Sequence, residues 1–134
     1  MVKKGVILDT NIAIGLLNDN KIVVETIQAL QKDFYEFYFS VVTKCELISG
    51  AKTDLEMQAV KSIEHSRFID VNHEIATIAG EIRLEQKNEE NRVVKAPDAL
   101  IIATAIYRIY DLFTLDKGMW FAEKYGLKLI KAAD

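Results

Sequence analysis

Four carboxylates in this chain of 134 residues stand where a predicted strand ends or a predicted helix begins. They are Asp9, Glu46, Asp98 and Asp116. In a parallel α/β sheet, ligands bind at the carboxyl ends of the strands, and the helix that follows a strand begins at the same edge. We therefore expect the four side chains to face one edge of a sheet, although they are far apart along the chain.

Carboxylates gathered in this way repel one another. At about 4 Å, with an effective dielectric constant of about 20, each pair costs on the order of 4 kcal/mol, so either some pKa values rise or a cation binds. The donors are oxygens, with no Cys or His at the spacing of a zinc site, which points to Mg²⁺ or Mn²⁺. Two such ions roughly 3.5–4 Å apart can hold a phosphodiester and activate water for in-line attack. Asn11 and Thr114 are expected to support this site through hydrogen bonds to a carboxylate, a water on the metal or a phosphate.

Each acidic residue also has a purely structural interpretation. Asp9 suits a turn and helix cap after a strand, and Glu46 with Thr43 matches a capping box. Asp98 suits the first turn of a helix as a favourable anion, and Asp116 suits a turn. Ser, Thr and Asn also cap helices, so four caps at one edge need not all be carboxylates. The set as a whole therefore favours the metal site.

Hydrophobic periodicity predicts the strands and helices that position these residues. Short apolar or β-branched runs predict strands at 6–8, 37–42, 67–71, 112–115 and 127–130. Apolar residues at helical spacing predict helices at 12–17, 22–32, 43–50, 53–65, 74–88, 97–110 and 119–125. Strands that alternate with helices predict an α/β fold, a three-layer α/β/α sandwich around a short, mostly parallel central sheet. The length suits a single domain over residues 1–134.

Local signals refine several of these elements. Pro97 at the first helical position, with the apolar run after it, predicts a deeply buried helix, and Gly126 predicts the end of the preceding short helix. The polar segment 85–92 is expected to be solvated. Cys45 is expected in the core, because a lone Cys beside apolar residues is most often buried. The aromatic run 34–39 is expected in the core or at a dimer surface.

Composition limits the class of function. The net charge is −3, whereas a protein that holds DNA mainly by neutralising phosphates is usually basic. This disfavours a sequence-specific DNA binder but not a nuclease with an acidic site. The apolar runs are too short for a membrane span, the first residues lack a signal-peptide pattern, and the single cysteine fits a reducing compartment. We expect a cytoplasmic protein without a membrane partner.

Four segments resemble the PIN-domain family, and within it the VapC-type toxin ribonucleases of toxin–antitoxin pairs. They are ILDTN (Ile7 to Asn11), CELISG (Cys45 to Gly50), PDALIIATA (Pro97 to Ala105) and TLD (Thr114 to Asp116). The segments occur in the family's order and at compatible spacing across nearly the whole chain. The sequence departs from the family after the fourth segment, where members often have Asp-Phe and this chain has KGMWF, from Lys117 to Phe121.

The resemblance implies a PIN-like α/β/α fold and metal-dependent cleavage of single-stranded or structured RNA. By position, Asp9, Glu46 and Asp98 correspond to the family's core acidic residues, and Asp116 corresponds to a fourth that is Asn or Asp in members. Thr114 corresponds to the hydroxyl residue two places earlier. The resemblance also implies a small antitoxin protein that blocks the acidic site, and a homodimer.

Two other functions stay open at this point. A haloacid-dehalogenase-like phosphatase would use Asp9 as a nucleophile, but its signature has a second Asp where this chain has Asn11. A phospho-aspartate trapped on Asp9 would identify that reaction. A non-catalytic PIN-like binding module would bind no Mn²⁺ in calorimetry. The leading interpretation is a Mg²⁺- or Mn²⁺-dependent endoribonuclease, the toxin of a type II toxin–antitoxin pair.

Overall fold

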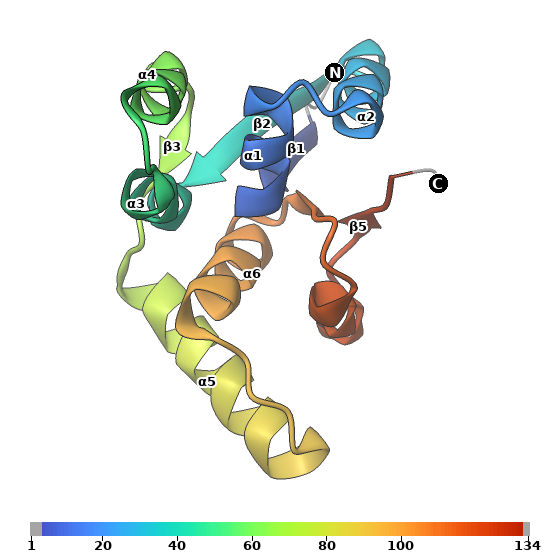
Figure 1. Ribbon diagram of the computed structural model, residues 1–134. Coiled ribbons are helices and arrows are strands. Elements are labelled where there is room, and N and C mark those ends of the chain that lie inside the picture. The colour runs from blue at the N-terminus through green and yellow to red at the C-terminus, as the bar shows by residue number, and fades with distance from the viewer. Residues whose placement is uncertain (1–3, 133–134) are drawn as a thin grey trace.

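A parallel sheet of five strands organises residues 4–132, the part of the chain that the computed structural model describes. The strands are β1 (Lys4–Leu8), β2 (Tyr35–Ser40), β3 (Phe68–Ile69), β4 (Asp111–Phe113) and β5 (Leu129–Ile130). They pair in the order β3-β2-β1-β4-β5, so β1 lies at the centre (Figure 1). Each of these pairings is parallel. The prediction of an α/β fold around a short parallel sheet is confirmed.

Helices cover both faces of the sheet and produce three layers. They are α1 (Thr10–Leu17), α2 (Lys21–Lys32), α3 (Val41–Gly50), α4 (Asp54–Ser62), α5 (His73–Glu90), α6 (Ala96–Arg108) and the 3-10 helix η1 (Lys117–Tyr125). One core joins the sheet to α1, α2, α3 and α4, and the other joins it to α5, α6 and η1. Helices α5 and α6 pack along each other (Figure 1).

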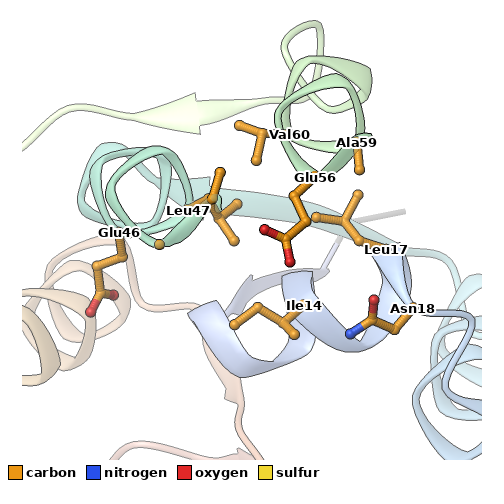
Figure 2. A pocket seen from close by; sticks show the side chains of 10 residues that line it. Ile14, Leu17, Asn18, Glu46, Leu47, Glu56, Ala59 and Val60 are labelled. Carbon is orange, nitrogen blue, oxygen red and sulfur yellow. The ribbon is translucent and has the colours of Figure 1, made fainter. Parts of the chain in front are cut away.

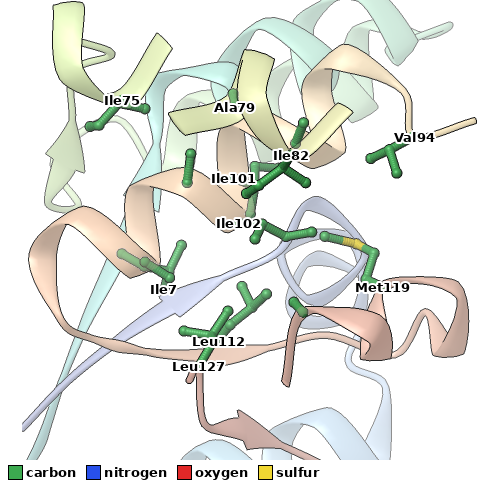
Figure 3. Close-up of a cluster of buried hydrophobic side chains, with 14 of the residues drawn as sticks. Ile7, Ile75, Ala79, Ile82, Val94, Ile101, Ile102, Leu112, Met119 and Leu127 are labelled. Carbon is green, nitrogen blue, oxygen red and sulfur yellow. The ribbon is translucent and has the colours of Figure 1, made fainter. Parts of the chain in front are cut away.

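Strand β1 contributes to both cores, which explains its unbroken apolar sequence. Val6 and Leu8 belong to the core that contains α1 and α2. Ile7, between them, belongs to the opposite core, where Figure 3 shows it with Ile102 and Leu112. A strand that is buried on both faces has a continuous run of hydrophobic residues rather than an alternating pattern. The end of this strand therefore emerges from the centre of the molecule.

The start of α3 differs from the prediction. Ser40 caps the helix, and its hydroxyl accepts a hydrogen bond of 3.1 Å from the backbone N–H two residues later. The predicted capping box of Thr43 and Glu46 is wrong, because Ser40 is a competent cap three residues earlier. Thr43 is instead buried inside the helix, and Glu46 lies in the second turn, not the first. A capping box does occur at the start of α4, between Thr53 and Glu56.

One prediction about burial is also wrong, and another, the solvated segment 85–92, is confirmed for most of its residues but not for Gln86. Cys45 is exposed, because it lies on the side of α3 opposite the buried residues of that helix. Gln86, in the segment expected to be solvated, is completely buried. It continues the buried face of α5, which is formed by Ile75, Ala79 and Ile82. The polar end of this helix is therefore partly interior.

Other local predictions are confirmed or refined. Pro97 lies in the first turn of α6, one residue after the helix begins, and Gly126 ends η1 with a left-handed φ of +83°. The aromatic run divides between core and surface, with Tyr35 and Phe39 buried and Phe34 65% exposed. No helix within residues 4–132 combines the length and apolarity needed to cross a bilayer.

Gly5 provides a test of the packing around β1. A Cβ atom at this position would lie 2.5 Å from Cδ1 of Tyr110, a ring that stacks on Tyr38 with centroids 4.9 Å apart. We predict that Gly5→Ala lowers the free energy of unfolding by about 1–3 kcal/mol, because the ring must move and the stack is disturbed. Urea denaturation measures the change.

The matched control for this prediction is Gly80→Ala in α5. A Cβ atom there would meet nothing within 4 Å, so alanine should stabilise the helix by about 0.5–1 kcal/mol. Equal unfolding free energies for the two variants would contradict the proposed close contact between Gly5 and Tyr110.

Candidate active site

Asp9 lies at the junction between the central strand and α1. It follows the last residue of β1 and caps α1, and its Oδ1 accepts a hydrogen bond of 2.8 Å from the Thr10 N–H. Its Oδ2 accepts a hydrogen bond of 2.7 Å from the hydroxyl of Thr114. The side chain is only 4% exposed. Both carboxylate oxygens are therefore oriented by the protein in a nearly dry environment.

The environment of Asp9 disfavours its charged form. Burial raises the pKa of this carboxyl from 3.8 to about 6, because a carboxylate removed from water loses its solvation. The hydrogen bonds from Thr114 and from the Thr10 N–H lower the pKa, whereas the negative charges of Asp98 and Glu46 raise it. Burial outweighs the hydrogen bonds, so the pKa of Asp9 stays well above the usual value for an aspartate.

The hydroxyl of Thr10 connects Glu46 to the turn that follows β1. Thr10 Oγ1 donates a hydrogen bond of 2.5 Å to Glu46 Oε1, and it lies 3.0 Å from Thr43 Oγ1. Thr10 follows Asp9 directly, so the same turn holds both acidic side chains. Because α1 packs against α3, this contact spans 36 residues of sequence. Glu46 is half-buried at this position.

Asp98 is the common neighbour of the other three carboxylates. It lies half-buried in the first turn of α6. Burial raises its pKa, and the negative charges of Asp116 and Glu46 raise it further, while Lys95 lowers it. The charge of Asp98 also acts on Asp9. The other three predicted carboxylates are thus within electrostatic reach of Asp98.

Asp116 is the most exposed of the four and caps the start of η1. Its Oδ1 accepts a hydrogen bond of 2.8 Å from the Gly118 N–H, and its own N–H donates to Thr114 Oγ1 at 3.0 Å. Thr114 is thus bonded to both Asp9 and Asp116. Asn11 holds the same loop, because its Oδ1 accepts a hydrogen bond of 3.2 Å from the Leu115 N–H and its Nδ2 lies 3.4 Å from Thr114 Oγ1.

The donor set suits a hard divalent cation, although the side chains do not already form a ligand set. All four groups are carboxylates, and two of them have pKa values raised partly by their like-charged neighbours. A divalent cation would relieve that repulsion. Within residues 4–132, however, no three His, Cys, Asp or Glu side chains are grouped so that they could hold a metal ion as they stand. A bound ion would have to draw these carboxylates together.

A groove of about 340 Å³ adjoins this site. Asp98 and Asp116 form part of its wall, and Arg92 and Lys95, from the connection between α5 and α6, form another part. The groove therefore combines negative charges that could hold cations with positive charges that could attract an anion. Its mixed character suits a phosphate-containing substrate whose charge is shared between metal ions and basic side chains.

Two residues that order the site are not among those predicted from the sequence. Thr10 orients Glu46. The only indication of this role in the sequence is that a hydroxyl residue directly follows Asp9. Gln86 contacts Arg92 with a hydrogen bond of 2.9 Å from Nη1 to Oε1. The sequence indicates the burial of Gln86 only through its spacing, which continues the apolar face of α5.

Comparison with known proteins identifies the fold. A family model described as the PIN domain matches residues 6–134. The solved VapBC2 complex of Rickettsia felis, bound to a promoter DNA fragment, contains a chain similar to this one at a TM-score of 0.79 and 21% identity, with 96% of this chain and 99% of that chain covered. No curated protein sequence gave a significant match.

Two further solved structures are similar. A toxin–antitoxin complex from Klebsiella pneumoniae contains a chain with 28% identity and a TM-score of 0.65, covering 83% of this chain and 86% of that one. The PIN domain endonuclease Utp24 has 18% identity and a TM-score of 0.60, covering 97% of this chain and 86% of that one. These likenesses concern the fold of the chain.

The buried charge of Asp9 predicts a pH-dependent gain in stability for Asp9→Asn. Between pH 3.8 and about 6 the folded state binds more protons at this group than the unfolded state does, so the stability contributed by this group falls as the pH rises through this window. Without divalent cations, we predict that Asn raises the free energy of unfolding by about 1–2 kcal/mol at pH 7.5 and changes it little at pH 4.

Urea denaturation at the two pH values measures this difference. Asp70→Asn is the control, because Asp70 is exposed and should show no such gain. A loss of stability for Asp9→Asn at pH 7.5 would contradict the prediction.

Proposed function

The chain belongs to the PIN domain family, and we propose from this premise that it is a Mg²⁺- or Mn²⁺-dependent endoribonuclease, the toxin of a toxin–antitoxin pair. The observation that carries the proposal is the grouping of the four carboxylates at the carboxyl edge of the sheet. Thr114 is hydrogen-bonded to both Asp9 and Asp116, Thr10 is hydrogen-bonded to Glu46, and Asp98 lines one groove with Asp116. The similarity to chains from toxin–antitoxin complexes and to an endonuclease supports it. The donor chemistry of the site suits phosphodiester hydrolysis.

In this proposal, Asp9, Glu46, Asp98 and Asp116 hold the cation. When bound, Mg²⁺ or Mn²⁺ supplies a Lewis acid for hydrolysis of the phosphodiester. Thr114 keeps the Asp9 carboxylate oriented and favours its ionised form. Lys95 reduces the repulsion that acts on Asp98. Hydrogen bonds from Thr114 and Thr10 hold the Asp9 and Glu46 carboxylates in place, and the cation would draw the other carboxylates toward them.

The structure also offers a surface for the proposed antitoxin. A cavity of about 190 Å³ lies between α1, α3 and α4, and Figure 2 shows Ile14, Leu17, Leu47 and Val60 around it. Glu46 lies at one side of this cavity. A partner segment with apolar side chains that filled it would therefore reach the acidic site, as expected of an inhibitor.

The other elements of the proposal follow from the family resemblance. We propose RNA as the substrate, a homodimer as the assembly and the cytoplasm as the location. Within residues 4–132, Leu84 and Val93 are large apolar side chains that are 61% and 82% exposed. They are suitable contacts for a second copy of the chain.

A non-catalytic PIN-like module is the second candidate. The observation that favours it is that no ready-made ligand set exists among residues 4–132. The phosphatase alternative has less support, because the amide of Asn11 accepts from the Leu115 N–H and replaces the second Asp which that chemistry uses. Metal binding distinguishes the non-catalytic module from the nuclease.

We predict that Asp9→Asn, Glu46→Gln and Asp98→Asn each reduce RNA cleavage in Mn²⁺ by at least about 100-fold, because each removes a charged ligand of the ion. Time courses with labelled RNA, with Asp70→Asn as the exposed control, measure the loss. Cleavage at the wild-type rate by Asp9→Asn or Asp98→Asn would refute the proposed nuclease.

The raised pKa of Asp9 predicts how metal binding depends on pH. Protons compete with the cation for this carboxylate, so Mn²⁺ affinity should fall as the pH decreases below about 6. Thr114→Val removes a hydrogen bond that lowers this pKa, and should therefore move the fall in affinity to higher pH. Isothermal titration calorimetry at several pH values measures both effects. An affinity that does not change between pH 5 and 8 would contradict the role of Asp9.

A further inference from the structure

The connection between α5 and α6 brings two positive charges to the acidic edge. Arg92 and Lys95 line the same groove as Asp98 and Asp116, and both basic side chains are exposed. Lys95 is close enough to lower the pKa of Asp98. Arg92 forms no ion pair with either aspartate among the described residues. Its positive charge therefore stays available beside the two carboxylates.

Neutral partners hold the side chain of Arg92 in place. Its Nη1 donates a hydrogen bond of 2.9 Å to Gln86 Oε1, and its guanidinium lies 4.9 Å from the centroid of the Phe121 ring. Neither contact cancels the charge of the guanidinium. An arginine has five N–H donors in a planar arrangement, and only one of them is used within residues 4–132. The other donors remain for a ligand.

Gln86 is itself fixed in orientation. Its side chain is completely buried, and its Nε2 donates to the hydroxyl of Tyr125 at 3.1 Å. That hydroxyl in turn donates to Glu85 Oε1 at 2.7 Å. These bonds direct the amide oxygen of Gln86 toward Arg92, and a buried polar network of this kind is rigid when its members are satisfied.

The backbone of the connection is held as well. The Arg92 N–H donates to the carbonyl oxygen of Gln86 at 3.0 Å, and Arg83 Nε donates to the carbonyl oxygen of Val94 at 2.8 Å. Val94 is buried in the core. The segment that carries Arg92 and Lys95 is thus fixed to α5 from both its backbone and its side chains.

We propose that Arg92 is a substrate-binding residue that contacts a phosphate of the RNA in this groove, and that Gln86 is its positioning residue. This inference rests on the proposed function. Arginine is suited to the role because its planar donors match two phosphate oxygens. A guanidinium that is fixed before binding loses less conformational entropy when the phosphate arrives. Arg92 would then line one groove with Asp98 and Asp116, two of the carboxylates proposed to hold the cation.

The test compares Arg92→Ala and Arg92→Lys with Lys32→Ala, which removes one exposed positive charge from α2 on the other face of the sheet. The probe is a short, labelled single-stranded RNA of randomised sequence, cleaved in Mn²⁺. We expect Arg92→Ala to raise KM about tenfold with kcat within about twofold, because one charge-assisted contact is lost. Arg92→Lys should recover part of this loss, and Lys32→Ala should resemble the wild type.

Binding without cleavage provides an independent measurement. In an Asp9→Asn background, fluorescence anisotropy at several salt concentrations gives the slope of log affinity against log salt. Loss of one phosphate contact should reduce this slope by about 0.7 for single-stranded RNA. The same reduction should not occur with Lys32→Ala.

The positioning role of Gln86 requires a double-mutant cycle. Gln86→Met keeps a similar volume but removes the hydrogen bond to Arg92, so it should raise KM by less than Arg92→Ala does. In the Arg92→Ala background it should raise KM no further, because the residue that it positions is gone. A purely structural role would raise KM equally in both backgrounds, and thermal unfolding of each variant monitors the fold.

The outcomes separate this inference from the function on which it rests. If the wild type cleaves or binds the RNA while Arg92→Ala matches Lys32→Ala in KM and in salt slope, the inference is wrong and the nuclease proposal stands. If the wild type neither cleaves nor binds RNA, both fail. A KM effect of Arg92→Ala that Gln86→Met does not share would refute the positioning role alone.

Discussion

The carboxylate of Asp9 is buried at the end of the central strand, and the surrounding structure is arranged to tolerate that charge. The Asp9 N–H donates to the carbonyl oxygen of Phe113 at 3.0 Å, which continues the pairing of β1 with β4 by one residue. That register brings the hydroxyl of Thr114 against the carboxylate. Hydrogen bonds thus replace part of the solvation that the charge has lost, although burial still dominates and raises the pKa of Asp9.

The site is assembled from both layers of helices. Asp9 and Glu46 come from the side of α1 and α3, where Thr10 connects them. Asp98 and Asp116 come from the side of α6 and η1. Both layers can contribute side chains to the carboxyl edge of a parallel sheet, because the helices that follow the strands begin there. Hydroxyls and backbone N–H groups orient Asp9, Glu46 and Asp116. Among residues 4–132, no basic side chain forms an ion pair with these three acids and competes with a cation.

The connection between α5 and α6 contributes two basic side chains, Arg92 and Lys95, to the groove beside the site. Lys95 acts on Asp98 directly, whereas Arg92 is held apart by Gln86 and Phe121. Because neutral groups hold the Arg92 guanidinium, it does not pair with the aspartates, and positive and negative side chains line the same groove. The buried amide of Gln86 makes this possible, because its two polar ends are satisfied by Arg92 and the hydroxyl of Tyr125.

The sequence by itself determined the α/β class, the parallel sheet and the positions of most helices, because hydrophobic periodicity and alternation are local properties. It also indicated that Asp9 ends a buried strand and that Asp98 lies in the first turn of a buried helix. Only the tertiary structure decided that Ser40 and not Thr43 caps α3, that Cys45 is exposed, and that Gln86 is buried. Local patterns cannot specify which of two competent caps is used or what covers a given helix face. The network of Thr10, Thr43 and Glu46 and that of Gln86 and Arg92 depend on how helices pack against one another, and helix packing is decided by the whole core.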